Sequence, residues 1–177
     1  MIFSGFGGQG VLTLGQIVAS IVMNKGKEVT WMPSYGPEMR GGTANCSIIV
    51  SDTVIGSPFV PDAIDVLVAM NVASVMKFEQ RLKPGGLMIV NTSIVTPQFM
   101  PTRTDITIIG IDATNIANSV GSPKVQNMVM VAGFLKELDL FTIEDVKKVV
   151  TDILGSKKAD LIDTNIKAVE KGLESIA

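Results

Sequence analysis

The 177-residue sequence contains no histidine and only one cysteine, Cys46. Histidine is the commonest general base and the commonest metal ligand, so its absence excludes triads that depend on it. A single thiol cannot build a disulfide framework, an iron–sulfur cluster or a structural zinc site. Because Cys46 lies in the apolar run 46–50, we predict a small core residue on a strand, and we assign no metal ligand in the chain.

Charged residues are scarce as well. They make up 18% of the chain, against about 25% in ordinary soluble proteins, while apolar residues reach 46%. Residues 1–75 hold eight of the 32 charges, and residues 123–177 hold seventeen. Soluble monomers avoid large exposed apolar patches, so we expect the N-terminal part to be covered by another chain and the C-terminal third to face solvent. The composition therefore predicts a subunit.

Long apolar runs and basic clusters are also missing. No apolar run reaches the length of about 18 residues that spans a bilayer, and the N-terminus lacks a basic stretch followed by an apolar core and a cleavage site. The net charge is −2, and no basic cluster interleaves with aromatic residues to neutralise phosphates. The sequence therefore predicts a cytoplasmic protein with neither a membrane nor a nucleic acid as partner.

Short apolar runs alternate with helical patterns along the chain, which is typical of the α/β class. The length suits one domain, residues 1–177, since about 150 residues is the usual size of a single core. The continuous apolar run 65–70 is typical of a strand buried on both faces of a parallel sheet. The predicted strands are 2–4, 28–32, 45–51, 65–70, 87–91 and 106–111, and the predicted helices are 11–24, 72–82, 124–138, 142–154 and 163–175.

Three details of this pattern carry specific expectations. Glycine costs about 1 kcal/mol relative to alanine in a helix interior, so we expect Gly15 to permit a close backbone approach. Pro33 is expected to end the second strand, and residues 83–86 to break the helix that precedes the fifth strand. Asp112 and Thr114 are expected to begin a short helix, because both side chains can satisfy free amides at a helix start. The function of residues 112–121 is left open.

The first glycine-rich loop, Gly5–Gly10, lies between a predicted strand and a predicted helix. Its glycines satisfy the G-x-G-x-x-G spacing, and free amides at the helix start would suit a phosphate. A dinucleotide site also needs an acidic residue about 20 residues later, and the stretch Thr30–Ser34 has none. The lysine followed by serine or threonine of an ATPase phosphate loop is missing too. A tight turn without a ligand therefore remains the alternative.

The second polar loop, Ser34–Asn45, combines an aromatic ring, a carboxylate and a guanidinium among glycines. Arg40 is the strongest candidate for a contact, because a guanidinium binds phosphate or carboxylate through two parallel hydrogen bonds. The alternative is an internal pair between Glu38 and Arg40, which at an exposed position contributes less than about 1 kcal/mol. Both loops follow strands, so we expect them to emerge together at the carboxyl edge of the sheet.

Taken together, Gly5–Gly10 and Pro33–Ala44 resemble the gamma subunit of the 2-oxoacid:ferredoxin oxidoreductases. The likeness extends through Ile55–Pro58, Met70–Asn71 and Lys83–Gly86, and so covers most of residues 1–95. The resemblance implies a three-layer α/β/α sandwich with a mostly parallel sheet. The amino-acid sequence of residues 38–45 is more similar to the 2-oxoglutarate and branched-chain 2-oxoacid forms than to the pyruvate form.

The resemblance also implies a division of labour between chains. In that family, thiamine diphosphate and magnesium on partner subunits decarboxylate a 2-oxoacid, iron–sulfur clusters pass electrons to ferredoxin, and coenzyme A takes the acyl group. The sequence has neither a cysteine cluster nor the Gly-Asp-Gly motif for thiamine diphosphate. The chain is therefore expected to bind none of these cofactors alone and to be inactive alone. Its implied partners are the alpha, beta and ferredoxin-like delta subunits of the complex, and ferredoxin.

No residue is assigned a catalytic role, and the two loops are expected to face the partner subunits and the coenzyme A or thiamine region. The residues implied as cofactor-binding are Gly5, Phe6, Gly7, Gly8, Gln9, Gly10, Ser34, Tyr35, Glu38, Arg40, Gly41, Gly42 and Thr43. The alternatives are the small subunit of an indolepyruvate ferredoxin oxidoreductase, a free-standing NAD-binding dehydrogenase domain and a non-enzymatic nucleotide-binding or scaffolding module.

Overall fold

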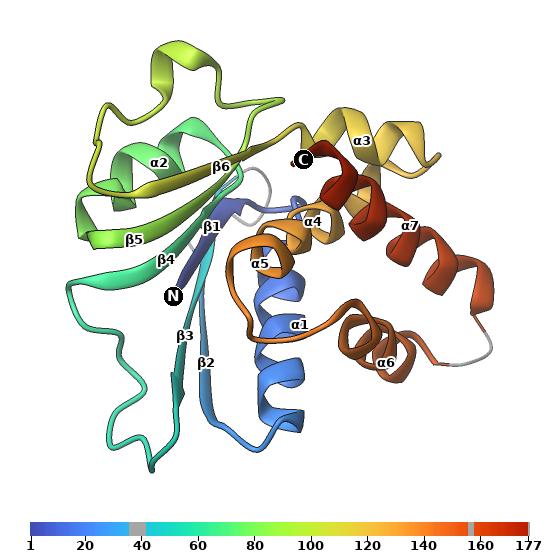
Figure 1. The fold of residues 1–177 in the computed structure, drawn as a ribbon, viewed down its shortest axis with the longest axis horizontal. Helices are drawn as coiled ribbons and strands as arrows, with labels where there is room; N and C mark the ends of the chain where they lie inside the picture. Colours follow the sequence, from blue (N-terminus) through green and yellow to red (C-terminus); the bar gives the residue numbers. More distant parts are fainter. Residues whose placement is uncertain (36–41, 156–157, 177) are drawn as a thin grey trace.

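A computed structural model describes residues 1–35, 42–155 and 158–176 (Figure 1). Six strands form one sheet in the order β2-β3-β1-β4-β5-β6. Strand β3 runs antiparallel to both of its neighbours, whereas β1, β4, β5 and β6 pair in parallel. The strands are β1 (Ile2–Phe6), β2 (Glu28–Tyr35), β3 (Thr43–Ser51), β4 (Ile64–Ala69), β5 (Leu82–Asn91) and β6 (Thr107–Ile111). The mixed, mostly parallel sheet confirms the predicted α/β class.

Helices cover both faces of this sheet (Figure 1). Helix α2 (Val72–Phe78) lies on one face, and α1 (Val11–Asn24) lies on the other together with the helices of the C-terminal third. Those helices are α3 (Ala113–Ser119), α4 (Gln126–Val129), α5 (Val131–Glu137), α6 (Ile143–Leu154) and α7 (Ala159–Ser175). Short 3₁₀ turns occupy Glu79–Arg81 (η1), Pro97–Phe99 (η2) and Pro123–Val125 (η3). The arrangement is the predicted three-layer sandwich.

Alternating strand residues build the two cores. In β1, Ile2 joins the core under α2, whereas Phe3 joins the larger core under α1. The ring of Phe3 stacks on Phe134 at 5.6 Å between centroids, and Phe134 stacks on Phe141 at 6.1 Å. These contacts fix the C-terminal helices on the sheet, because buried aromatic rings contribute large apolar areas and offset stacking.

Helix α1 approaches the sheet closely at Gly15, as predicted. A β-carbon at Gly15 would lie 2.3 Å from the Cys46 sulfur, so only glycine fits between this helix and β3. Cys46 is fully buried, which confirms it as a core residue on a strand. Burial raises the pKa of its thiol to about 12, because a thiolate would be poorly solvated there, while a hydrogen bond with Trp31 opposes part of that shift.

Several element boundaries differ from the predicted ones. Strand β2 continues through Pro33 to Tyr35, because it is an edge strand, where a residue without an N–H is tolerated. Strand β5 begins at Leu82 rather than 87, since Leu82 already pairs with Ile64 before a bulge. Helix α2 ends at Phe78 and continues as a 3₁₀ turn, the expected helix 124–138 is divided at Met130, and α7 starts at Ala159 instead of 163.

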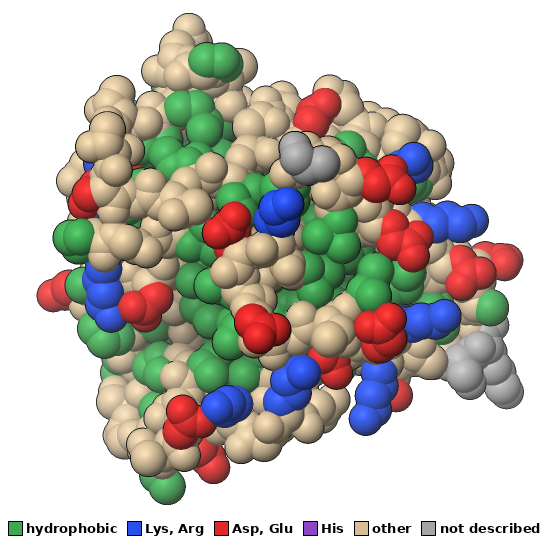
Figure 2. Space-filling view, in the orientation of Figure 1, with side chains coloured by type: hydrophobic (Ala, Val, Ile, Leu, Met, Phe, Trp, Pro, Cys, Tyr) green, Lys and Arg blue, Asp and Glu red, His purple; other side chains and the backbone are tan. Residues whose placement is uncertain are grey.

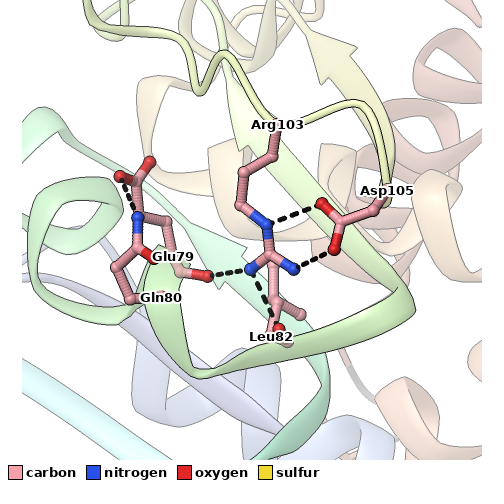
Figure 3. A network of polar contacts seen from close by, with 5 residues as sticks. All are labelled: Glu79, Gln80, Leu82, Arg103 and Asp105. Carbon is pink, nitrogen blue, oxygen red and sulfur yellow. Dashed lines mark hydrogen bonds and ion pairs between the residues drawn. The ribbon is translucent and has the colours of Figure 1, made fainter.

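The connection between β5 and β6 is fastened by one guanidinium (Figure 3). Arg103 donates through Nε and NH2 to the two carboxylate oxygens of Asp105, at 2.9 and 2.7 Å. Its NH1 group donates to the carbonyls of Glu79 and Leu82, both at 2.9 Å. The hydrogen bonds from Arg103 hold the pKa of Asp105 below its usual value of 3.8. Arg103 thereby ties the connection to the start of β5.

The charges are distributed as the sequence predicts for its C-terminal third. Acidic and basic side chains are dense over α6 and α7 in Figure 2. The start of α6 carries a capping box, in which the Thr142 hydroxyl accepts from the amide of Asp145 and the Asp145 carboxylate accepts from the amide of Thr142. That carboxylate also pairs with Lys25 at 2.9 Å.

Across the described residues, every helix is too short or too polar to cross a membrane.

Candidate functional site

The two glycine-rich loops meet at one edge of the sheet. Strands β1 and β2 are both antiparallel to β3, so they point the same way and end together. Phe6 pairs with Thr43, and the amide of Gly7 donates to the carbonyl of Gly42 at 3.0 Å. The prediction that both loops emerge at the carboxyl edge is therefore confirmed.

The second loop joins β2 to β3, two strands that pair antiparallel further into the predicted loop than expected. Ser34 pairs with Asn45, and Tyr35 pairs with Ala44, so both strands extend into the segment that the sequence assigned to a loop. Ser34 and Thr43 are exposed on these strands. The rest of this loop, residues 36–41, lies outside the described residues and includes the predicted contacts Glu38, Arg40 and Gly41.

The first loop is closed by its own hydrogen bonds. The amide of Phe6 donates to the side-chain oxygen of Gln9 at 2.7 Å, and the amide of Gln9 donates to the carbonyl of Phe6 at 3.1 Å. Gly8 and Gly10 adopt positive φ angles of 96° and 74°, which glycine tolerates best. Together with Gly7, three of the loop amides are already paired inside the chain. They are not free to cradle a diphosphate.

Gln9 is the hub of a polar network that ties this loop to the junction between β4 and α2. Its side-chain nitrogen donates to the carbonyl of Met70 at 3.2 Å, and its oxygen accepts from the side-chain amide of Asn71 at 3.2 Å. The Asn71 oxygen in turn accepts from both the amide and the hydroxyl of Ser74 at 2.9 Å. The Ser74 hydroxyl also lies 2.9 Å from that of Ser4. Asn71, Ser74 and Ser4 are all buried.

A shallow pocket of about 240 Å³ lies on the other side of the same loop. Its lining includes the first turn of α1, whose start at Gly10 has no side-chain cap. The amides of that turn carry a partial positive charge that favours anions. The described lining contains no charged side chain; it consists of Phe6, Gly7, Gly8, Gly10, Val11, Leu12, Thr13 and Ala44. The pocket can hold a ligand or a partner segment, but it contains no acid, base or nucleophile.

The sequence does not predict that Asn127, from the C-terminal layer of helices, supports the first loop. Asn127, 6% exposed, donates to the carbonyl of Gly10 at 3.3 Å. A β-carbon on Gly10 would lie 2.8 Å from the Asn127 side chain. The two residues are 117 positions apart, so no local pattern links them.

Helix α3 (Ala113–Ser119) is the expected short helix, but its start is stabilised differently from the prediction. The Ser93 hydroxyl accepts from the amide of Thr114 at 2.9 Å, while the Asp112 carboxylate accepts from Ser93 and from the side chain of Asn115. The buried Asn91 at the end of β5 donates to Thr114 at 3.2 Å. These polar groups satisfy one another at the carboxyl ends of β5 and β6.

Within the ranges that the structure describes, His, Cys, Asp and Glu nowhere form a group of three or more around a metal-sized site.

Comparisons with known proteins assign the chain to a defined family. The family description "Pyruvate ferredoxin/flavodoxin oxidoreductase" matches residues 1–175. The ketoisovalerate oxidoreductase subunit VorA of Methanothermobacter marburgensis is 34% identical over 172 residues, which cover 97% of this chain and 35% of VorA. The chain thus spans about a third of that relative. The 2-oxoglutarate synthase subunit KorC of Methanocaldococcus jannaschii is 32% identical over 173 residues, covering 97% of this chain and 90% of KorC.

A solved structure agrees with the sequence matches. The keto/oxoacid ferredoxin oxidoreductase gamma subunit of Geobacter sulfurreducens is similar with a TM-score of 0.80 and 28% identity, covering 99% of this chain and 96% of that one. The chain therefore belongs to the pyruvate ferredoxin/flavodoxin oxidoreductase family, as a gamma-type subunit of the 2-oxoacid:ferredoxin oxidoreductases. The resemblance carried by the two loops is confirmed.

Proposed function

We propose that this chain is the gamma subunit of a complex that oxidatively decarboxylates 2-oxoglutarate to its acyl-coenzyme A, with ferredoxin as electron acceptor. The observation that carries the proposal is the carboxyl edge itself. Two glycine-rich loops are hydrogen-bonded side by side there, next to a pocket whose described lining has no catalytic group. Such an edge suits a surface that is completed by neighbouring chains. The choice of 2-oxoglutarate is supported by the match over 90% of KorC.

The cofactors of the reaction belong to the partners under this proposal. The only thiol is fully buried in the core, so it does not fit an iron–sulfur cluster. The proposed partners are the alpha, beta and ferredoxin-like delta subunits, with ferredoxin as the final acceptor. Coenzyme A is the proposed ligand of this edge, because the uncapped first turn of α1, unlike the paired amides of Phe6, Gly7 and Gln9, offers amides to an anion. The proposed contacts are the loop residues Gly5–Gly10, Ser34, Tyr35, Gly42 and Thr43.

Residues of the second loop extend this proposal. Glu38, Arg40 and Gly41 are proposed to complete the same contact surface, although they lie outside the described residues. A guanidinium at Arg40 would bind a phosphate or carboxylate through two hydrogen bonds. We expect Arg40→Ala to lower the turnover of the complex or to raise its requirement for coenzyme A. Arg40→Lys is the matched control, because it keeps the charge but loses the paired geometry.

The test is to express this chain together with the subunits encoded beside it and to assay the purified complex. Reduction of ferredoxin is measured with coenzyme A and, in turn, 2-oxoglutarate, a branched-chain 2-oxoacid, pyruvate and indolepyruvate. We expect the highest kcat/KM with 2-oxoglutarate, and no activity from this chain alone. A preference for indolepyruvate would identify the alternative small subunit, and turnover by the isolated chain would contradict the proposal.

A dinucleotide titration tests the dehydrogenase alternative. We expect no NADH binding, because the amides of Phe6, Gly7 and Gln9 are paired within the chain and no acidic residue stands among residues 30–34. Micromolar binding of NADH to the full chain would support the dehydrogenase instead.

A further inference from the structure

The geometry points to Gln9 as a positioning residue whose side chain fills the crevice where this type of sheet usually binds ligands. The chain leaves β1 toward α1 on one face and leaves the adjacent strand β4 toward α2 on the opposite face. In open α/β sheets, ligands bind outside the carboxyl ends of two such strands. Here the space between the ends of β1 and β4 is occupied by the chain itself.

The carboxamide of Gln9 acts there as a substitute peptide group. The last direct contact between the strands is the bond from the Met70 amide to the Ser4 carbonyl, 2.9 Å long. One step further, the oxygen of Gln9 accepts from the β1 residue Phe6, and its nitrogen donates to the carbonyl of Met70. The side chain therefore continues the ladder where the two backbones diverge. Asn71 adds a second donor to the same oxygen.

This arrangement leaves a single accessible side of the loop among the described residues. The crevice side is closed by Gln9, and the opposite side carries the pocket lined by Phe6, Gly8 and Thr13. The tight packing of Gly5 supports the same picture, since a β-carbon there would lie 2.7 Å from the Gln9 oxygen and 2.9 Å from the Met70 side chain. Gln9 thus sets the loop so that its amides at the start of α1 face the pocket. The inference rests on the proposed function for its catalytic consequence, but not for its structural one.

The structural consequence is tested by amide hydrogen exchange on the full chain. Gln9→Met keeps the length of the side chain but can neither accept from Phe6 nor donate to Met70. We expect the Phe6 amide to exchange at least about fivefold faster in this variant, because it loses its only acceptor in the described structure. The Leu14 amide, which donates to Gly10 at 2.9 Å, should be unchanged. Gln9→Leu also lacks an acceptor for the Phe6 amide and carries the test if Gln9→Met does not fold, since unchanged exchange of the Phe6 amide in it would equally overturn the role of Gln9.

The catalytic consequence is tested in the assembled complex. We expect Gln9→Met to raise the apparent KM for coenzyme A about three- to tenfold while kcat stays within about twofold, since the loop is displaced but no reacting group is lost. Asn91→Ala is the control, because Asn91 is a side-chain amide at the end of β5 that likewise donates one hydrogen bond and accepts another, away from the loop; it is more deeply buried than the half-buried Gln9. It should change neither value.

The outcomes separate the two claims. Unchanged Phe6 exchange in Gln9→Met, or an equal rise in KM in Asn91→Ala, would overturn the role of Gln9. A wild-type complex that turns over none of the four oxoacids would overturn the proposed function instead, while the exchange experiment would still decide the role of Gln9.

Discussion

The close packing of Gly15 against Cys46 predicts that Gly15→Ala lowers the free energy of unfolding in the wild-type background but not in a background that lacks the Cys46 sulfur. In Gly15→Ala, the new methyl group would lie 2.3 Å from the buried sulfur and 3.3 Å from the indole nitrogen of Trp31. Strand β3 is paired on both sides and cannot retreat. Overpacking of this kind costs about 1–3 kcal/mol, and the better helix propensity of alanine offsets about 1 kcal/mol. The variant should therefore lose up to about 2 kcal/mol of unfolding free energy.

The same substitution should become neutral or favourable when the sulfur is absent. Cys46→Ala alone removes one buried heavy atom and should cost about 1 kcal/mol. In the Cys46→Ala background, the methyl group of Gly15→Ala occupies the vacated space and keeps its propensity gain of about 1 kcal/mol. The coupling energy between the two positions should thus be about 1–3 kcal/mol, well above the error of about 0.5 kcal/mol in additivity.

Urea unfolding of the four proteins measures this cycle, with the fluorescence of the single tryptophan, Trp31, and circular dichroism as two probes. Gly172→Ala is a suitable control, because its β-carbon would meet the carbonyl of Val129 at 2.7 Å and gains nothing from removal of the sulfur. Additive free energies for Gly15→Ala and Cys46→Ala would refute the packing argument.

Three further outcomes are expected. Arg103→Lys should lower the Tm and speed proteolysis between β5 and β6, because an ammonium cannot make the paired bonds to Asp105 and the two carbonyl contacts together. The pKa of Asp145 is lowered from 3.8, first by the Thr142 amide and then by Lys25, so its stabilisation is present above that pH and lost as the pH falls through the lower folded-state value. Asp145→Asn should therefore flatten the dependence of the urea midpoint on pH below about 4. Burial raises the pKa of Cys46 to about 12, so iodoacetamide at pH 8 should alkylate the native chain at least about tenfold more slowly than the urea-unfolded chain; equal rates would contradict the buried thiol.

The sequence predicts the elements of this fold better than their directions. Helix α1 was predicted with its observed bounds, because its apolar residues repeat at helical spacing between a glycine loop and a polar turn. The antiparallel course of β3 was not predicted, since an apolar run such as 46–50 has the same pattern in either direction. Pro33 misled the assignment of β2, because its tolerance depends on the edge position of that strand in the sheet.

The site was predicted as two loops at one edge, and its supporting contacts were not. The glycine motifs identify the loops because positive φ angles and close approaches demand glycine locally. The bonds of Gln9 to Met70 and Asn71 join residues 61 and 62 positions apart, and nothing in either segment alone reveals them. The contact of Gln9 with a cofactor stays a prediction, and what the sequence does not predict is that its side chain makes these hydrogen bonds within the chain.

The hairpin between β2 and β3 gives this architecture a point of variation. Strands β2 and β3 pair with each other as far as Tyr35 and Ala44, and β1 is held by its own pairing with β3. The number of residues that join β2 to β3 can therefore change without shifting the register of β1 or the position of α1. Evolution can therefore reshape one rim of this edge to suit different assemblies while the neighbouring glycine turn keeps its form.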